Sequence, residues 1–152
     1  MIKFFNIRRA DSSLFQKNIK DVIRIFKKTN FINGEEVERF EANFAKYCNV
    51  KYSIGCNSGS DAIFLALKSL NLKKNSEVIV PSLTDVGCIT PVILMGLKPI
   101  PADIDVFSFN INIEQIKKKI TAKTKAVIVA HIGGEVANII EIKKFLQKKN
   151  IY

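Results

Sequence analysis

A run of small and hydroxyl-bearing residues, Gly55 to Asp61, lies between an apolar segment that predicts a strand and another that predicts a helix. At such a turn, backbone N–H groups and the positive end of the helix dipole point at a bound anion. Ser58 and Ser60 could donate further hydrogen bonds, and Gly59 would let the backbone approach a ligand closely. The run therefore indicates a phosphate-binding turn. An ordinary helix N-cap at Ser58 or Ser60, with Asp61 in the first helical turn, stays open as an alternative.

Polar residues also follow two later strands in the predicted order. Thr84 and Asp85 come after the apolar run 77–81, and His131 lies at the end of a strand predicted over 126–132. In open α/β sheets, ligands bind beyond the carboxyl ends of the strands, so all three residues are candidate ligand contacts. Helix capping by Thr84 and Asp85, and a buried, hydrogen-bonded His131, are the alternatives.

Asp103 and Asp105 are two residues apart on a predicted strand. Their side chains would point to one face of the sheet, as a pair of working carboxylates needs. The residues that follow, 107–109, favour roles in turns and caps instead.

Hydrophobic periodicity predicts the helices and strands on which these residues lie. Apolar residues at helical spacing predict a helix that begins at residues 11–13 and ends at residues 27–30. A second predicted helix has Val37, Phe40, Phe44 and Tyr47 on one face. From residue 52 onward, strand and helix patterns alternate. Strands are expected over 52–56, 77–81, 100–104 and 126–132, and helices over 61–70, 86–95, 113–120 and 136–148.

Two of the predicted strands contain continuously apolar runs, residues 78–80 and 126–130. Such strands are expected when helices cover both faces of a sheet. Their alternation with helices predicts an α/β fold in three layers, with a mostly parallel sheet and helices on both faces.

Charge, cysteine content and the length of apolar runs limit which binding partners and which cellular compartment are expected. The formal net charge of +10 raises the question of nucleic acid, but the lysines form short groups beside apolar helical patterns, which fits solvated helix faces. Three scattered cysteines and a single histidine argue against a disulfide framework or a zinc site. No apolar run reaches the length of a membrane span, and residues 1–7 are too short for a signal peptide's apolar core. A cytoplasmic protein that binds no membrane is therefore expected.

In their order along the chain, these motifs resemble the DegT/StrS-type sugar-nucleotide aminotransferases, which are pyridoxal-phosphate (PLP) enzymes of the aspartate-aminotransferase-like class. Residues 31–41 resemble the family's opening Gly…Val-x-x-Phe-Glu segment, and residues 57–62 its Ser-Gly-Thr-x-Ala phosphate loop. Residues 77–84, 99–112 and 121–133 are similar to three later strand segments of the family. The resemblance covers nearly the whole chain, and the ordered series is specific although each motif alone is weak.

The resemblance implies a truncated large domain of the PLP-transferase fold, with residues 1–50 as a helical opening segment and residues 51–152 as the cofactor-binding part. It implies that Gly59 and Ser60 hold the cofactor phosphate with Ser58 nearby, and that Thr84, Asp85 and His131 belong to the same cofactor site. The family passes an amino group from glutamate to a keto sugar nucleotide, for polysaccharide or cell-surface sugar biosynthesis. Its members are typically homodimers.

Two departures from the family pattern matter. The residue after Thr84 is usually an aromatic that stacks on the pyridine ring, and here it is Asp85, whose carboxylate offers no apolar face. The aspartate that pairs with the pyridinium nitrogen and the lysine that forms the Schiff base have no matching positions within residues 1–152. We therefore expect this chain alone to be inactive as an aminotransferase and to expose apolar surface.

Two other functions stay open. One is a non-catalytic module that binds a phosphate or nucleotide at residues 58–60; stabilisation by such a ligand that is lost in Ser60→Ala and does not depend on PLP would indicate it. The other is a basic nucleic-acid-binding protein, which would show steeply salt-dependent retention on DNA or RNA. The lack of any recognised nucleic-acid-binding motif argues against it.

Overall fold

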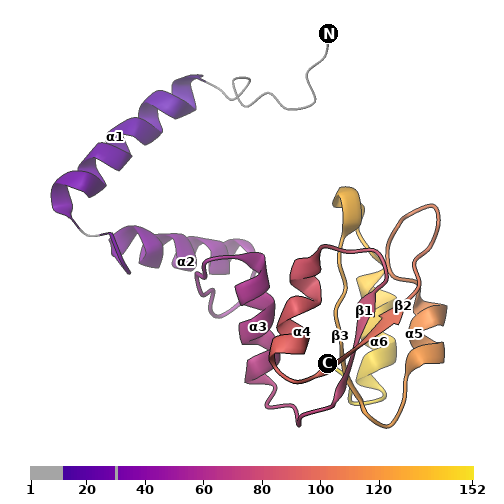
Figure 1. Cartoon of the computed structure of the whole chain (residues 1–152). Helices are drawn as coiled ribbons and strands as arrows, with labels where there is room; N and C mark the ends of the chain where they lie inside the picture. The colour runs from indigo at the N-terminus through magenta and orange to yellow at the C-terminus, as the bar shows by residue number, and fades with distance from the viewer. Residues whose placement is uncertain (1–11, 30) are drawn as a thin grey trace. The chain divides into compact units, whose positions relative to one another are not determined.

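The computed structural model describes residues 12–29 and 31–152, in two compact units that divide between Gly55 and Cys56 (Figure 1). The first unit contains the helices α1 (Ser12–Lys28) and α2 (Glu35–Tyr47), so both predicted N-terminal helices are confirmed. Residues 11 and 30, within the predicted limits of the first helix, lie outside the described residues.

Charged side chains join α1 to α2. Arg24 Nη2 lies 2.6 Å from Glu36 Oε1, and Lys28 Nζ lies 3.0 Å from Glu35 Oε2. The Arg24 guanidinium is hydrogen-bonded to the carboxylates of Glu36 and Asp21, and these contacts raise its pKa. Acidic residues in the first turn of α2 also interact favourably with the positive end of its helix dipole. The same carboxylates therefore stabilise α2 itself and its contact with α1.

The second unit alternates strands and helices. Its sheet has the strand order β2-β1-β3, and both pairings are parallel. Along the chain the elements are α3 (Gly59–Ser69), β1 (Glu77–Pro81), the 3₁₀ turn η2 (Val86–Cys88), α4 (Thr90–Leu94), β2 (Lys98–Ala102), α5 (Ile113–Lys119), β3 (Thr124–Val127), the 3₁₀ turn η3 (Ile132–Gly134) and α6 (Ile139–Gln147).

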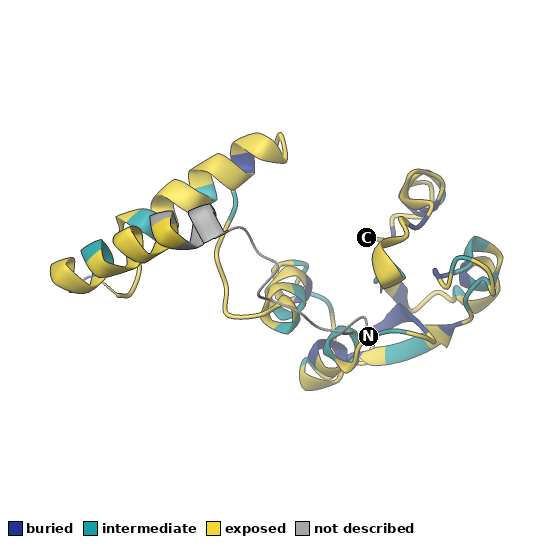
Figure 2. Ribbon diagram, turned by 90° about the horizontal axis from the view of Figure 1, so that it is seen from above, coloured by how far each residue is buried: buried dark blue, intermediate teal, exposed yellow. Residues whose placement is uncertain are grey.

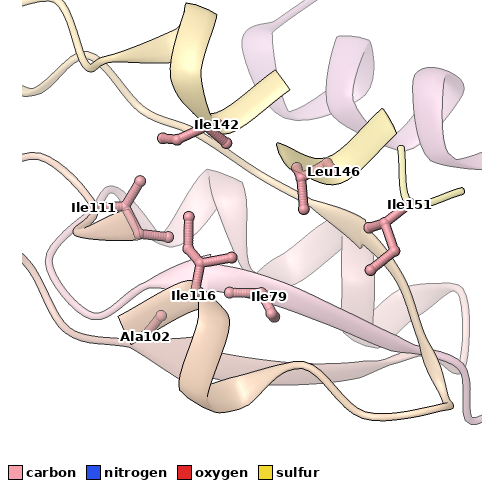
Figure 3. Close-up of a cluster of buried hydrophobic side chains, with 7 residues drawn as sticks. All are labelled: Ile79, Ala102, Ile111, Ile116, Ile142, Leu146 and Ile151. Atoms are coloured by element: carbon pink, nitrogen blue, oxygen red, sulfur yellow. The ribbon is translucent and has the colours of Figure 1, made fainter. Parts of the chain in front are cut away.

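Side chains of β1 alternate between two apolar clusters, one on each face of the sheet. Val78 and Val80 pack with residues of α3 and α4. Ile79 packs on the opposite face with Ile116 of α5 and Ile142 of α6, as Figure 3 shows. Figure 1 accordingly shows α3 and α4 on one side of the strands and α5 and α6 on the other. The three-layer, mostly parallel α/β fold is confirmed.

Burial follows the same arrangement. All five residues of β1 are buried, which explains why its sequence carries no polar alternation. The edge strand β2 is less covered, with only Ala102 buried, and Figure 2 shows exposed residues over the outer faces of the helices. Among the described residues, no helix combines the length and apolar character that crossing a membrane requires.

Three predicted elements differ from the structure. The strand expected over 52–56 is absent: Tyr52 and Ile54 are 71% and 79% exposed, and no described strand pairs with this segment. An extended segment becomes a strand only when a neighbour satisfies its backbone groups. The helix expected over 86–95 is divided into η2 and α4, because Asp85 caps a separate 3₁₀ turn and Pro91 stands at the start of α4.

The strand expected over 126–132 is displaced toward the N-terminus and ends at Val127. Ile128 N–H still donates to Ile79 O at 2.8 Å, after which the chain turns into η3. Gly133 in this turn has φ of 62°, a left-handed conformation that a strand does not contain. His131 therefore lies in a loop rather than on a strand.

Candidate functional site

The N-terminal end of α3 is organised by Ser58. This residue is the N-cap: its Oγ accepts a hydrogen bond from Asp61 N at 3.1 Å and lies 3.0 Å from Asp61 Oδ2, to which it donates. The capping interpretation of Ser58 and Asp61 is thus confirmed. A capped first turn does not exclude a ligand, because the cap satisfies only one of the free N–H groups at the helix start.

Two N–H groups at this end of α3 remain available. Those of Gly59 and Ser60 have no acceptor among the residues that the structure describes. A Cβ added to Gly59 would meet nothing within 4 Å, so open space lies against this turn. Free N–H groups with open space before them, at the positive end of an eleven-residue helix, suit a phosphate or carboxylate.

Ser60 also faces the segment that follows β1. A Cβ built on Gly87 would lie 2.5 Å from Ser60 Oγ and 2.7 Å from Asp85 Oδ1, so the three residues are in close contact. Asp85 Oδ1 accepts a hydrogen bond from Gly87 N at 2.7 Å and caps η2. The capping interpretation of Asp85 is therefore confirmed. Gly87 was missed in the sequence, although a glycine two residues after an aspartate is a recognisable turn signal.

Thr84 has an unusual environment. Its Oγ1 is the only side-chain nitrogen or oxygen in the described part of the chain that is buried without a hydrogen-bond partner. A buried hydroxyl without a partner is costly, so an acceptor or donor from a ligand would be favourable at this position. The cap of η2 is Asp85, not Thr84.

His131 is exposed, so the alternative of a buried core residue is wrong, and its role as a ligand contact stays a prediction. Its Nδ1 accepts a hydrogen bond from Ala137 N at 3.1 Å within the loop between β3 and α6. Within residues 12–29 and 31–152, no hydrogen bond joins His131 to Ser58, Gly59, Ser60, Thr84 or Asp85. The structure brings Ser60 and Asp85 together, and places His131 after β3, the strand adjacent to β1.

The two aspartates after β2 have turn roles. Asp103 Oδ1 accepts from Ile104 N at 2.9 Å and lies 3.3 Å from the hydroxyl of Ser82. Asp105 Oδ1 accepts from the N–H groups of Ser108 and Phe107, and these bonds hold the pKa of Asp105 below its usual value. The preference for turn roles over a catalytic pair is confirmed.

The open sheet with parallel strand pairs and helices on both faces defines the second unit as an α/β domain. The model of the DegT/DnrJ/EryC1/StrS aminotransferase family matches residues 13–152, and the chain belongs to this family.

Relatives and solved structures agree with this assignment. The dTDP-3-amino-3,6-dideoxy-alpha-D-galactopyranose transaminase of Aneurinibacillus thermoaerophilus is 34% identical over 152 residues, which cover 99% of this chain and 42% of the relative. GDP-perosamine synthase of Vibrio cholerae is 33% identical over 119 residues, which cover 78% of this chain and 32% of the relative. The chain thus spans less than half the length of these relatives.

Among solved structures, DesV of S. venezuelae superimposes with a TM-score of 0.94 at 28% identity, covering 99% of this chain and 41% of DesV. NtdA of Bacillus subtilis, solved with its cofactor PMP bound, has a TM-score of 0.93 at 25% identity over 99% of this chain and 35% of NtdA. The resemblance inferred from the ordered motifs is confirmed.

Proposed function

We propose that this chain is part of a PLP-dependent aminotransferase that transfers an amino group from glutamate to a keto sugar nucleotide. The names of the transaminase of Aneurinibacillus thermoaerophilus and of other relatives support this reaction. The PMP bound to NtdA and the PLP bound to a related E. coli dehydratase support the cofactor. The observation that carries the proposal is that the N–H groups of Gly59 and Ser60 have no acceptor among the described residues, with open space against Gly59.

The residues present fit a cofactor phosphate. Gly59 and Ser60 offer backbone donors, and Ser60 offers a hydroxyl that has no hydrogen bond within the described part of the chain. Thr84 Oγ1, in the segment that follows β1, has no hydrogen-bond partner among the described residues. The donors of residues 59–60 and the hydroxyl of Thr84 belong to the same unit of the chain. Their two segments are in contact through Ser60 and Gly87.

Each residue has a separate task in the proposed site. Gly59 and Ser60 bind the phosphate oxygens, while Ser58 is engaged with Asp61 and holds the first turn of α3 in place. Asp85 is engaged with Gly87 and supplies no apolar face for a ring. When bound, PLP would supply two things: an aldehyde that takes up the amino group, and a pyridine ring that withdraws electrons.

Titration of PLP into the chain tests the phosphate site. We expect Ser60→Ala to weaken PLP binding about tenfold, since a hydrogen bond to a charged group is lost. The matched control is Ser69→Ala at the other end of α3, where the hydroxyl donates to Ala66 O. Equal affinities of the two variants for PLP would contradict the proposal. Binding of a nucleoside diphosphate but not of PLP would instead indicate the non-catalytic module.

A polypeptide of residues 1–152 is expected not to transaminate. None of its lysines matches the family's Schiff-base lysine, so the residues present include no identified nucleophile or base for the proton transfer. The measurement is turnover of a keto sugar nucleotide with PLP and glutamate, relative to a reaction without protein. Turnover above that background would contradict the expectation.

A further inference from the structure

The loop between β3 and α6 is held by a side chain from another segment. Asn110 is 4% exposed, and its Nδ2 donates to Glu135 O at 3.0 Å. Its Oδ1 accepts from Ile132 N at 3.2 Å. One buried amide therefore satisfies two backbone groups of residues 131–137, at both ends of the turn that contains Gly133.

Asn110 connects the segments that follow two different strands. It comes after β2, immediately before Ile111, which pairs with Ile104 in an antiparallel bridge. The held loop comes after β3, and β1 lies between β2 and β3 in the sheet. In a parallel sheet these segments meet at the carboxyl edge, and Figure 1 shows both loops at the same end of the strands. The amide thus links loops across the edge where the proposed cofactor site lies.

The same loop selects which ring nitrogen of His131 accepts a hydrogen bond. A ring nitrogen that accepts a hydrogen bond carries no proton, so the bond from Ala137 N to Nδ1 places the proton on Nε2. Ala137 is 3% exposed, and its N–H therefore needs this acceptor. The ring is exposed, and its Nε2 has no partner among the described residues. In this tautomer His131 offers its Nε2–H as a donor at the carboxyl edge.

We propose that Asn110 is a positioning residue that shapes the 131–137 loop so that His131, in its Nε2-protonated form, donates to an oxygen of the bound ligand. The donor role rests on the proposed function, since the ligand is PLP or a substrate bound beside it. The role of Asn110 in selecting the tautomer does not depend on any ligand.

Nitrogen NMR of the histidine ring tests the tautomer, and the chain's single histidine makes the signal unambiguous. We expect only the Nε2-protonated ring in the wild-type chain. In Asn110→Ala we expect both tautomers, with about tenfold faster exchange of the Ala137 amide, because two hydrogen bonds to the loop are lost. Asn110→Asp keeps an acceptor for Ile132 N but loses the donor to Glu135 O, so an intermediate result is expected.

The matched control is Asn112→Ala, which removes an amide two residues away that caps α5 through Glu114 N. This variant should leave the ring tautomer unchanged, which separates the proposed role from a general loss of stability. A wild-type ring protonated on Nδ1 would overturn the inference without any variant. An unchanged tautomer in folded Asn110→Ala would overturn the role of Asn110.

Titration with PLP separates this inference from the proposed function. We expect the His131 ring signals to shift with the same concentration dependence as the amides of Gly59 and Ser60. If the amides shift and the ring does not, His131 is not a ligand donor, and the phosphate site stands. If neither shifts, the proposed PLP site and the donor role both fail, while the tautomer still decides the role of Asn110.

Discussion

At the scale of single residues, Gly87 leaves no room for a side chain unless two neighbouring polar side chains move. The space that a side chain would need is occupied by Ser60 Oγ and Asp85 Oδ1. Gly59 differs, because the space beside it is empty in the folded chain. Substituting each glycine therefore separates a packing requirement from a ligand requirement.

We expect Gly87→Ala to lower the free energy of unfolding by about 1–3 kcal/mol, because the added methyl overpacks the contact between α3 and η2. Gly59→Ala should not lower it and could raise it by up to about 1 kcal/mol, but should weaken PLP binding by filling the open space. Urea unfolding and PLP titration measure the two effects. Gly59→Ala with full affinity for PLP would contradict the proposed phosphate site.

Asp105 makes one turn of the chain dependent on pH. Hydrogen bonds from Ser108 and Phe107 lower its pKa from 3.8, so the ionised form stabilises the fold above the unfolded-state pKa and the effect is lost as pH falls through the folded-state pKa. We expect Asp105→Asn to be less stable than wild type at about pH 6, with the difference shrinking below about pH 3.8. Urea midpoints at several pH values measure this. A constant difference would show that the carboxylate charge is not the cause.

At the scale of elements, the pairing of β1 with β3 contains an irregularity beside a buried carboxylate. Glu77 pairs with Thr124 while Val78 pairs with Ala126, so β3 has one extra residue at this point. Glu77 is 8% exposed, and its Oε2 accepts from the hydroxyls of Thr121 and Thr124. These bonds hold the start of β3 against β1 without an ion pair to Glu77 in the described part of the chain.

We expect Thr121→Val to lower the free energy of unfolding by about 1–3 kcal/mol, because it removes a donor to a buried carboxylate. Thr90→Val, at an exposed first position of α4, is the control and should change stability by no more than about 0.5 kcal/mol. Chemical denaturation measures both variants. Equal stability of the two would mean that the Glu77 contact does not hold the strands together.

At the scale of the whole molecule, much apolar surface is uncovered. Tyr47, Phe107 and Ile140 are each at least 80% exposed. An apolar groove of about 350 Å³ lies between β3 and α6, and its lining includes Val129 and Leu146. Exposed apolar surface on this scale favours association, either with other polypeptide or between copies of the chain.

We expect the chain to self-associate with rising concentration, and Ile140→Lys to reduce this because it replaces an 80% exposed apolar side chain of α6 with a charge. Gln147→Lys adds the same charge to α6 without removing apolar surface, and should reduce association less. Sedimentation at several concentrations measures the effect. If the two variants reduced self-association equally, the added charge rather than the lost apolar contact would be the cause.

Local sequence patterns were sufficient to predict most helices and strands of the chain, and their order was sufficient to predict its family. The apolar run of β1, the helical periodicity of α2 and the cap at Ser58 depend on residues within a few positions of one another, and such patterns can be interpreted without coordinates. Three features became visible only in the folded chain: residues 52–56 form no strand, Ser60 lies against Gly87, and Asn110 holds the loop of His131. Each of these depends on hydrogen bonding or packing between segments distant in sequence, which local patterns do not contain.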